Sequence, residues 1–142
     1  MGSILNSFGQ LKLFRGRFEG SYFVDKSDIL VKLNKVIGKV DEQYICITRP
    51  RRFGKTVMTN LISSYYAKGL PSKEIFDKLK ISENEDYEKH LNQHNVISLY
   101  MSDTPDECKS YDQYICFHRN EIKEELMENF PDCRLTKELS LS

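Results

Sequence analysis

The residues best suited to chemistry lie together in one short segment, which reads T-R-P-R-R-F-G-K-T over positions 48–56. Gly54, Lys55 and Thr56 match the second half of the phosphate-loop pattern G-x-x-x-x-G-K-[ST]. In that pattern backbone amides at a helix N-terminus face a phosphate, the lysine reaches the β- and γ-phosphates, and the hydroxyl ligates Mg²⁺. The first glycine of the pattern falls on Arg49, so the motif is incomplete. The segment predicts a loop that binds a nucleotide.

A second interpretation of this segment needs no nucleotide. Arg49, Arg51 and Arg52 form a dense basic turn, which is either simply solvated or contacts the phosphate backbone of a nucleic acid. The residues alone therefore leave two classes open. One is a nucleotide-binding domain, and the other is a non-enzymatic interaction or nucleic-acid-binding module that uses the basic loop Arg49–Arg52.

The charge of the whole chain hides a division between its two halves. The 142 residues carry 21 basic and 21 acidic side chains, which gives a formal net charge of zero. Residues 1–70, which contain the loop, hold twelve basic and five acidic side chains, whereas residues 71–142 hold nine and sixteen. With 39% hydrophobic and 30% charged residues, the composition is that of one soluble globular domain. The excess of basic side chains in residues 1–70 indicates that this half of the chain binds anions.

The sequence gives only weak signals for a membrane-spanning helix, a signal peptide or a metal-binding site. No apolar run approaches the roughly 20 residues of a membrane helix, and the N-terminus lacks the apolar core of a signal peptide. The four cysteines form no C-x-x-C pair, so we expect a reduced, cytoplasmic protein. His90 and His94 are spaced like zinc ligands, but no third ligand is evident, and we expect two solvated histidines on a helix surface.

The loop lies between two elements that would position it. Gln43–Thr48 is rich in β-branched and aromatic residues, which predicts a buried strand that contains an inert Cys46. A helix is predicted from about Lys55 to Lys68, with its apolar residues on one stripe and Gly69 at its end. A strand, a phosphate loop and a helix follow one another in the order that the motif requires.

Strands and helices alternate along the rest of the chain. Further strands are predicted at 22–24 and 96–101, and further helices at about 26–37, 72–79, 85–92 and 110–129, the last opened by Ser110 and Gln113 at capping-box spacing. This order predicts an α/β fold with a mainly parallel sheet and flanking helices. The single domain 1–142 then divides into an irregular lead-in (1–20), a nucleotide-binding core (21–105) and a helical extension (106–142).

The segment Y-I-C-I-T-R-P-R-R-F-G-K-T resembles the signature of the AAA-ATPase-like domain family of bacterial P-loop proteins. In that family the phosphate loop reads R-P-R-R-F-G-K-[ST], without the usual first glycine. Tyr22–Ser27 (Y-F-V-D-K-S) is similar to the family's Y-V-D-K-[ST] segment, and 76–81 and 95–99 follow the family's spacing. The resemblance covers about residues 10–105. It implies the N-terminal part of a P-loop ATPase, with ATP as ligand and Mg²⁺ as cofactor.

The same resemblance implies which residues bind the nucleotide. Lys55 would contact the phosphates, and Thr56 would hold Mg²⁺ through the bound nucleotide. Asp25 and Lys26 would line the site, although for Asp25 a simple helix N-cap is an equally open interpretation. The implied nucleotide-binding residues are Arg49, Pro50, Arg51, Arg52, Phe53, Gly54, Lys55, Thr56, Val57 and Asp25.

Two departures from the family pattern concern acidic residues. Tyr100 stands where the family carries an acid, and no apolar run after Lys55 ends in the Asp or Asp-Glu of a Walker B strand. We therefore expect a chain that is truncated before that strand and hydrolyses ATP poorly, and the sequence leaves its status as an enzyme open. An incomplete sheet with a free edge beside 96–101 also predicts a homo-oligomer.

The remaining candidate residues are expected to be structural. Tyr65 and Tyr66 are interpreted as packing residues rather than base-stacking platforms. The acidic residues Asp103, Asp106 and Glu107 suit a polar loop better than a metal site. The acids of the last predicted helix are expected on its solvent face, and they are Glu121, Glu124, Glu125 and Glu128.

Overall fold

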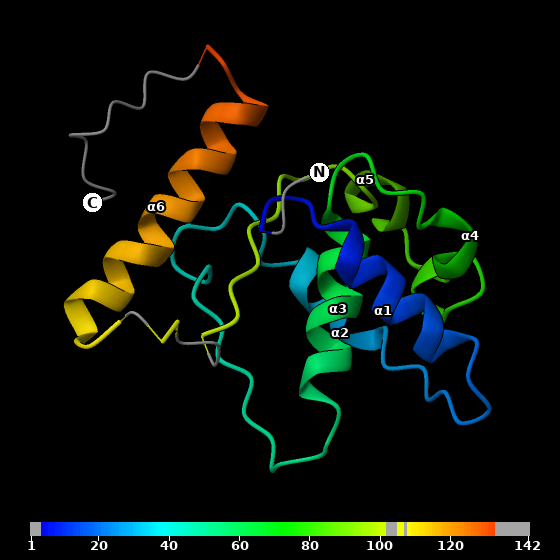
Figure 1. Cartoon of the computed structure of the whole chain (residues 1–142). Coiled ribbons are helices and arrows are strands. Elements are labelled where there is room, and N and C mark those ends of the chain that lie inside the picture. The colour runs from blue at the N-terminus through cyan, green and yellow to red at the C-terminus, as the bar shows by residue number, and fades with distance from the viewer. Residues whose placement is uncertain (1–3, 102–104, 107, 133–142) are drawn as a thin grey trace.

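The computed structural model describes residues 4–101, 105–106 and 108–132. The elements of this part are α1 (Phe8–Phe18), α2 (Asp28–Asn34), α3 (Lys55–Tyr66), α4 (Lys73–Phe76), the 3₁₀ helix η1 (Lys80–Glu83), α5 (Tyr87–His90) and α6 (Tyr111–Asn129). Figure 1 shows α1 to α5 gathered in one helical body, with α6 set beside it. None of the helices described is long and apolar enough to cross a membrane.

The prediction of an α/β fold with a mainly parallel sheet was wrong. Of the described residues, 49% are helical and 3% lie in β pairings, and they form no sheet. Those pairings are two isolated bridges, one antiparallel between Leu5 and Ile97 and one parallel between Ala67 and His94. The described part of the chain is a helical assembly joined by long extended segments (Figure 1).

The segment 43–48 shows why the predicted strands did not become a sheet. Every residue in it is exposed, and its backbone makes no backbone hydrogen bond to another described residue. The segment 96–101 instead meets the N-terminal residues, where Asn6 N–H donates to Val96 O (2.8 Å) and Ser98 N–H donates to Ile4 O (3.0 Å). Residues 22–24 likewise form no strand. Local composition favours extended backbone, but a ladder needs a neighbouring strand that composition does not specify.

Helix α1 occupies the region that was predicted to be an irregular lead-in. Leu11, Phe14 and Phe18 recur at helical spacing and pack toward α3, and Leu11 and Phe14 are fully buried. Gly9 and Gly16 lie on the exposed side, where each costs a helix roughly 1 kcal/mol relative to alanine. The burial of the apolar face outweighs that cost, as is usual for short helices in proteins.

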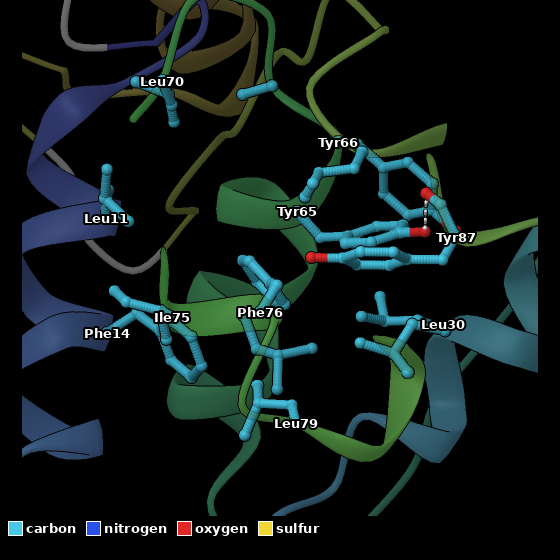
Figure 2. Close-up of a cluster of buried hydrophobic side chains, with 14 residues drawn as sticks. Leu11, Phe14, Leu30, Tyr65, Tyr66, Leu70, Ile75, Phe76, Leu79 and Tyr87 are labelled. Atoms are coloured by element: carbon cyan, nitrogen blue, oxygen red, sulfur yellow. Dashed lines mark hydrogen bonds between the residues drawn. The ribbon is translucent and has the colours of Figure 1, made fainter. Parts of the chain in front are cut away.

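The core lies where α1, α3 and α4 meet (Figure 2). Phe14 and Phe76 stack with ring centroids 5.6 Å apart, and Tyr65 meets Phe76 edge-on at 5.3 Å. All three side chains have zero exposed surface. Leu30 from α2 and Tyr87 from α5 close the far side of the cluster. Aromatic pairs of this kind contribute about 0.5–1.5 kcal/mol each beyond their buried area.

The two tyrosines at the end of α3 carry their hydroxyls into this core without leaving them unpaired. Tyr65 Oη donates to the carbonyl of Tyr87 (2.9 Å), as Figure 2 shows, and Tyr66 Oη donates to Oδ1 of Asn34 (2.6 Å). Asn34 Nδ2 in turn donates to Tyr65 Oη (3.2 Å). Burial raises the pKa of both hydroxyls above the ordinary value of 10.0. The interpretation of Tyr65 and Tyr66 as packing residues is confirmed.

The two longest helices, α3 and α6, begin where the sequence placed them. Helix α3 starts at Lys55, and Gly69 just beyond its end has a left-handed φ of +77°. Helix α6 starts after Ser110, whose Oγ accepts from Gln113 N–H (3.3 Å), while Gln113 Oε1 accepts from the amide of Lys109 (2.8 Å). Helix α2 is shorter than predicted and gives way to turns after Asn34.

Candidate functional site

The phosphate-loop segment forms the turn that enters α3 and projects from the lower end of that helix in Figure 1. Arg52 and Gly54 both adopt left-handed backbone, with φ of +66° and +77°. Glycine takes this conformation without steric cost, whereas for arginine it costs of order 1 kcal/mol or more. Two left-handed residues in three positions turn the chain sharply into the first turn of α3.

The N-terminus of α3 is left open toward this turn. Its N-cap is Gly54, no side chain caps its amides, and no acidic residue lies in its first turn. The first amides of a helix carry partial positive charge and lack partners within the helix. Thr56 and Lys55 are both exposed at this end. The arrangement is suited to an anion placed before the helix.

Two lysine ammonium groups contact the loop from different segments. Lys55 Nζ folds back and donates to the carbonyl of Arg49 (2.8 Å), the position at which the motif lacks its first glycine. Lys26 Nζ, from the connection between α1 and α2, donates to the carbonyl of Phe53 (3.4 Å). A Cβ on Gly54 would lie 3.4 Å from that ammonium, an ordinary van der Waals contact, so the left-handed φ of +77° rather than a lack of space favours glycine at this position. The structure thus brings Lys26 to the loop.

Asp25 faces a different set of partners from its neighbour Lys26. Its carboxylate accepts from the amides of Ser27 (2.8 Å) and Lys80 (2.8 Å) and so ties the start of α2 to the start of η1. Burial opposes ionisation of Asp25, but the two amide donors outweigh it and lower its pKa below the ordinary value of 3.8. The N-cap of α2 is Ser27 rather than Asp25.

A cavity of about 380 Å³ opens beside the loop. Val24 and Lys26 line it from the connection between α1 and α2, and Val57 lines it from α3. The full lining is Arg17, Tyr22, Phe23, Val24, Lys26, Arg52, Phe53, Gly54, Val57, Met58 and Leu61. Sequence reasoning missed Arg17, Tyr22, Phe23, Val24, Met58 and Leu61. The run 22–24 stands directly before the D-K pair, which was the available signal. The contribution of α1 was hidden because α1 itself was not predicted.

A second, smaller cavity of about 180 Å³ lies where the extended segment enters the loop. Ile47, Arg49 and Lys55 line it together with Phe53, Met58, Thr59 and Ile62. Phe53 of the loop and Met58 of α3 line both cavities and therefore lie between them.

Acidic residues contribute little to this site in the part of the chain that the structure describes. Asp106 is exposed, while Asp103 and Glu107 lie outside the described residues, as does the segment 133–142. Among the residues described, no group of three or more His, Cys, Asp or Glu side chains could hold a metal ion. Thr56, the residue that the resemblance implies for Mg²⁺, is exposed at the start of α3.

Several side chains outside the loop differ from their predicted surroundings. His90 is only 6% exposed, and its Nδ1 lies 3.0 Å from His94 Nε2, so the two histidines form a packed pair rather than solvated surface residues. Cys46 is exposed because its segment found no sheet to enter. Glu125 accepts from the amides of Ile4 and Leu5 instead of facing only solvent.

A family model described as "Predicted AAA-ATPase" matches residues 8–140. The match begins at the first residue of α1 and runs past the end of α6. No curated protein and no solved structure matches the chain.

Proposed function

Since the chain belongs to the predicted AAA-ATPase family, we propose that it binds ATP together with Mg²⁺ at residues 49–56. The observation that supports this most directly is the uncapped N-terminus of α3, which follows a left-handed Gly54 and has Lys26 and Lys55 beside it. Backbone donors, the helix dipole and two ammonium groups converge there, which is the chemistry that a chain of phosphates needs.

Lys55 has to exchange one partner for another when phosphates bind. In the structure its ammonium donates to the neutral carbonyl of Arg49. Charge-assisted hydrogen bonds to an anion are roughly twice as strong as bonds between neutral groups, so a phosphate competes well for the ammonium. Arg49, Arg51 and Arg52 are exposed around the loop and add positive charge that attracts the ligand.

Thr56 fits the role of Mg²⁺ ligand in this proposal. Its side chain is exposed at the open end of α3. Mg²⁺ keeps several waters and is bound together with substrate phosphates, so the Thr56 hydroxyl would be one ligand among these. When bound, the ion would neutralise phosphate charge. We further propose that hydrolysis is slow, because Tyr100 stands where the family carries an acid and no apolar run after Lys55 ends in the Asp or Asp-Glu of a Walker B strand.

The proposal is tested by titrating Mg-ATP into the wild type, Lys55→Ala and Lys68→Ala. Lys68 is an exposed lysine just beyond the opposite end of α3, about 20 Å from the loop by helix geometry, and serves as the matched control. Loss of a charge-assisted hydrogen bond should weaken affinity by at least about tenfold in Lys55→Ala, whereas Lys68→Ala should bind like the wild type. Equal binding by all three proteins contradicts the proposal.

The same proteins test the nucleic-acid alternative for the basic loop. Single-stranded DNA is titrated at about 50 and 200 mM salt, since phosphate contacts by Lys and Arg give a steep salt dependence. Binding of DNA with that dependence, and no binding of Mg-ATP, would favour the alternative and overturn the assignment of a nucleotide site.

A further inference from the structure

The outer face of α1 is exposed to solvent and positively charged. It consists of Gly9, Lys12, Leu13, Gly16 and Arg17, which are all exposed and together line a shallow hollow of about 590 Å³. Leu13 is 60% exposed at the middle of this face, although leucine is among the residues most often buried. Helix α1 contains three basic residues and no acidic one. The face therefore offers an apolar side chain between cations, which suits an acidic partner.

Helix α6 carries the opposite charge, with five acidic and two basic side chains. Its outer face consists of Phe117, Glu124, Met127 and Glu128, which are exposed and share one side of the helix at 3.6 residues per turn. Ile122, on the opposite side of the helix, is half-buried. Phe117 and Met127 are 38% and 46% exposed, so this face combines apolar side chains with carboxylates. It complements the outer face of α1 in both respects.

The charges on these two faces are not neutralised within the described part of the chain. No ion pair between described residues includes Lys12, Arg17, Glu124 or Glu128. Figure 1 shows α6 on one side of the extended segments and α1 on the other, so one molecule does not bring its own two faces together. A contact between the faces therefore requires two molecules.

We propose that the outer face of α1 in one molecule binds the outer face of α6 in a second copy of this chain. Lys12 then faces the carboxylate of Glu124, and Leu13 contacts the apolar side chain of Met127. Because the two faces of the contact differ, each molecule keeps one free face for a third, and the association is head-to-tail. The contact uses neither the phosphate loop nor a bound nucleotide, so it is independent of the proposed function.

The charge distribution favours a second copy over another acidic partner. The same chain supplies both faces, and their charges are equal in number: α1 has three basic residues, and α6 has an excess of three acidic ones. The formal net charge of the chain is zero, so two copies do not repel each other overall. The homo-oligomer predicted from a free sheet edge finds no such edge, because the described residues form only isolated β-bridges. The two helices supply the contact instead.

The association should be weak and sensitive to salt, since exposed ion pairs are individually weak and are screened as ionic strength rises. Sedimentation equilibrium of the wild type, from about 20 to 300 μM protein, is compared at about 0.02 and 0.5 M NaCl. At low salt the average mass should rise with protein concentration, and at high salt it should stay close to that of the monomer. A monomer at every concentration in low salt, or self-association that does not change with salt, overturns the inference.

Charge reversals locate the two faces. Lys12→Glu and Glu124→Lys each place like charges opposite one another and should weaken self-association at least about tenfold. Lys35→Glu is the matched control, because it changes the net charge as Lys12→Glu does, at an exposed lysine just beyond α2 and outside both faces. It should associate within about twofold of the wild type. All three positions are exposed, so the helix content should not change. Equal weakening by Lys12→Glu and Lys35→Glu overturns the inference.

Recombining the reversals tests whether the two faces meet each other. The double variant Lys12→Glu/Glu124→Lys restores opposite charges across the contact and should self-associate more strongly than either single variant. A mixture of the two single variants should form a complex with one molecule of each, because only one pair of faces is complementary in it. A double variant that associates no better than the single variants overturns the inference.

A membrane surface is the other occupant that a basic helix face with an exposed leucine could take. Co-sedimentation with vesicles of phosphatidylserine and phosphatidylcholine tests this on the same proteins. A wild type that stays monomeric at low salt but binds these vesicles, with binding lost in Lys12→Glu, overturns the inference in favour of a membrane. Self-association that follows the charge reversals, without binding to the vesicles, supports the second copy.

Discussion

The two ends of α3 lie in contrasting surroundings. At its C-terminal end Tyr65 and Tyr66 are buried, and their hydroxyls are paired with Tyr87 and Asn34. At its N-terminal end Lys55 and Thr56 are exposed, and the segment 39–53 before them is exposed throughout. One helix is therefore anchored by its last two turns and presents its first turn to solvent. Changes at the two ends should separate stability from ligand binding.

The largest expected effect lies at the anchored end. Phe76→Ala removes a fully buried ring that contacts Phe14 and Tyr65, and should lower the free energy of unfolding by about 3–5 kcal/mol. Urea denaturation followed by circular dichroism measures the change. Phe53→Ala, at the open end, is the control and should change stability by less than about 0.5 kcal/mol. Similar losses in both variants would show that the two ends are not distinct.

The next effect concerns the polar contacts of the anchored end. Asn34→Ala removes the acceptor of Tyr66 Oη and a donor to Tyr65 Oη, and leaves two buried hydroxyls short of partners. We expect a loss of about 2 kcal/mol, because an unsatisfied buried group costs about 1–3 kcal/mol. Tyr66→Phe removes the hydroxyl itself. The double variant Asn34→Ala/Tyr66→Phe should therefore lose less stability than the sum of the losses in the two single variants. Strictly additive losses would contradict the hydrogen bond between Tyr66 and Asn34.

The contrast between the two ends also explains which predictions from the sequence succeeded. Helix α3 and the capped start of α6 were predicted because their signals are local: an apolar stripe for α3, and Ser110 with Gln113 for α6. Tyr65 belongs to that stripe, and its burial followed from it. Where a few neighbouring residues decide the structure, the sequence is sufficient.

The failures concern features that distant residues decide. The segment 43–48 has the composition of a strand, but nothing in it specifies a partner, and none of the described backbone pairs with it. Helix α1 was missed because Gly9 and Gly16 weaken its local signal, while its burial depends on α3. For the candidate site, sequence reasoning reached the loop and Lys26 but not the contribution of Arg17, which depends on the packing of α1.

A smaller effect should appear with pH at the anchored end, where Tyr66 packs edge-on against the rings of His90 and His94. Burial, helped by His94 and Lys89 and opposed by Asp86, lowers the pKa of His90 below the ordinary value of 6.5. The unfolded chain then binds a proton more readily than the folded one, so stability should be full above about pH 6.5 and fall as the pH drops below it.

Denaturation at pH 7.5 and pH 5.5 measures this dependence, and His90→Asn should reduce it. His118, which pairs with Glu121 on α6, provides the comparison, and His118→Asn should keep the dependence. Stability that rises on acidification in the wild type would contradict the lowered pKa of His90.

The smallest effect on stability is expected in the exposed segment before the loop. Cys46→Ser should change the free energy of unfolding by less than about 0.5 kcal/mol, because its side chain is exposed and its backbone pairs with no other described residue. A buried strand would respond differently, since a hydroxyl placed in an apolar sheet costs about 1–3 kcal/mol. An exposed thiol also reacts quickly with a disulfide reagent under native conditions. Wild type and Cys46→Ser should therefore differ by one fast-reacting thiol, and a Cys46 thiol that reacts only after unfolding would show that the segment is buried in solution.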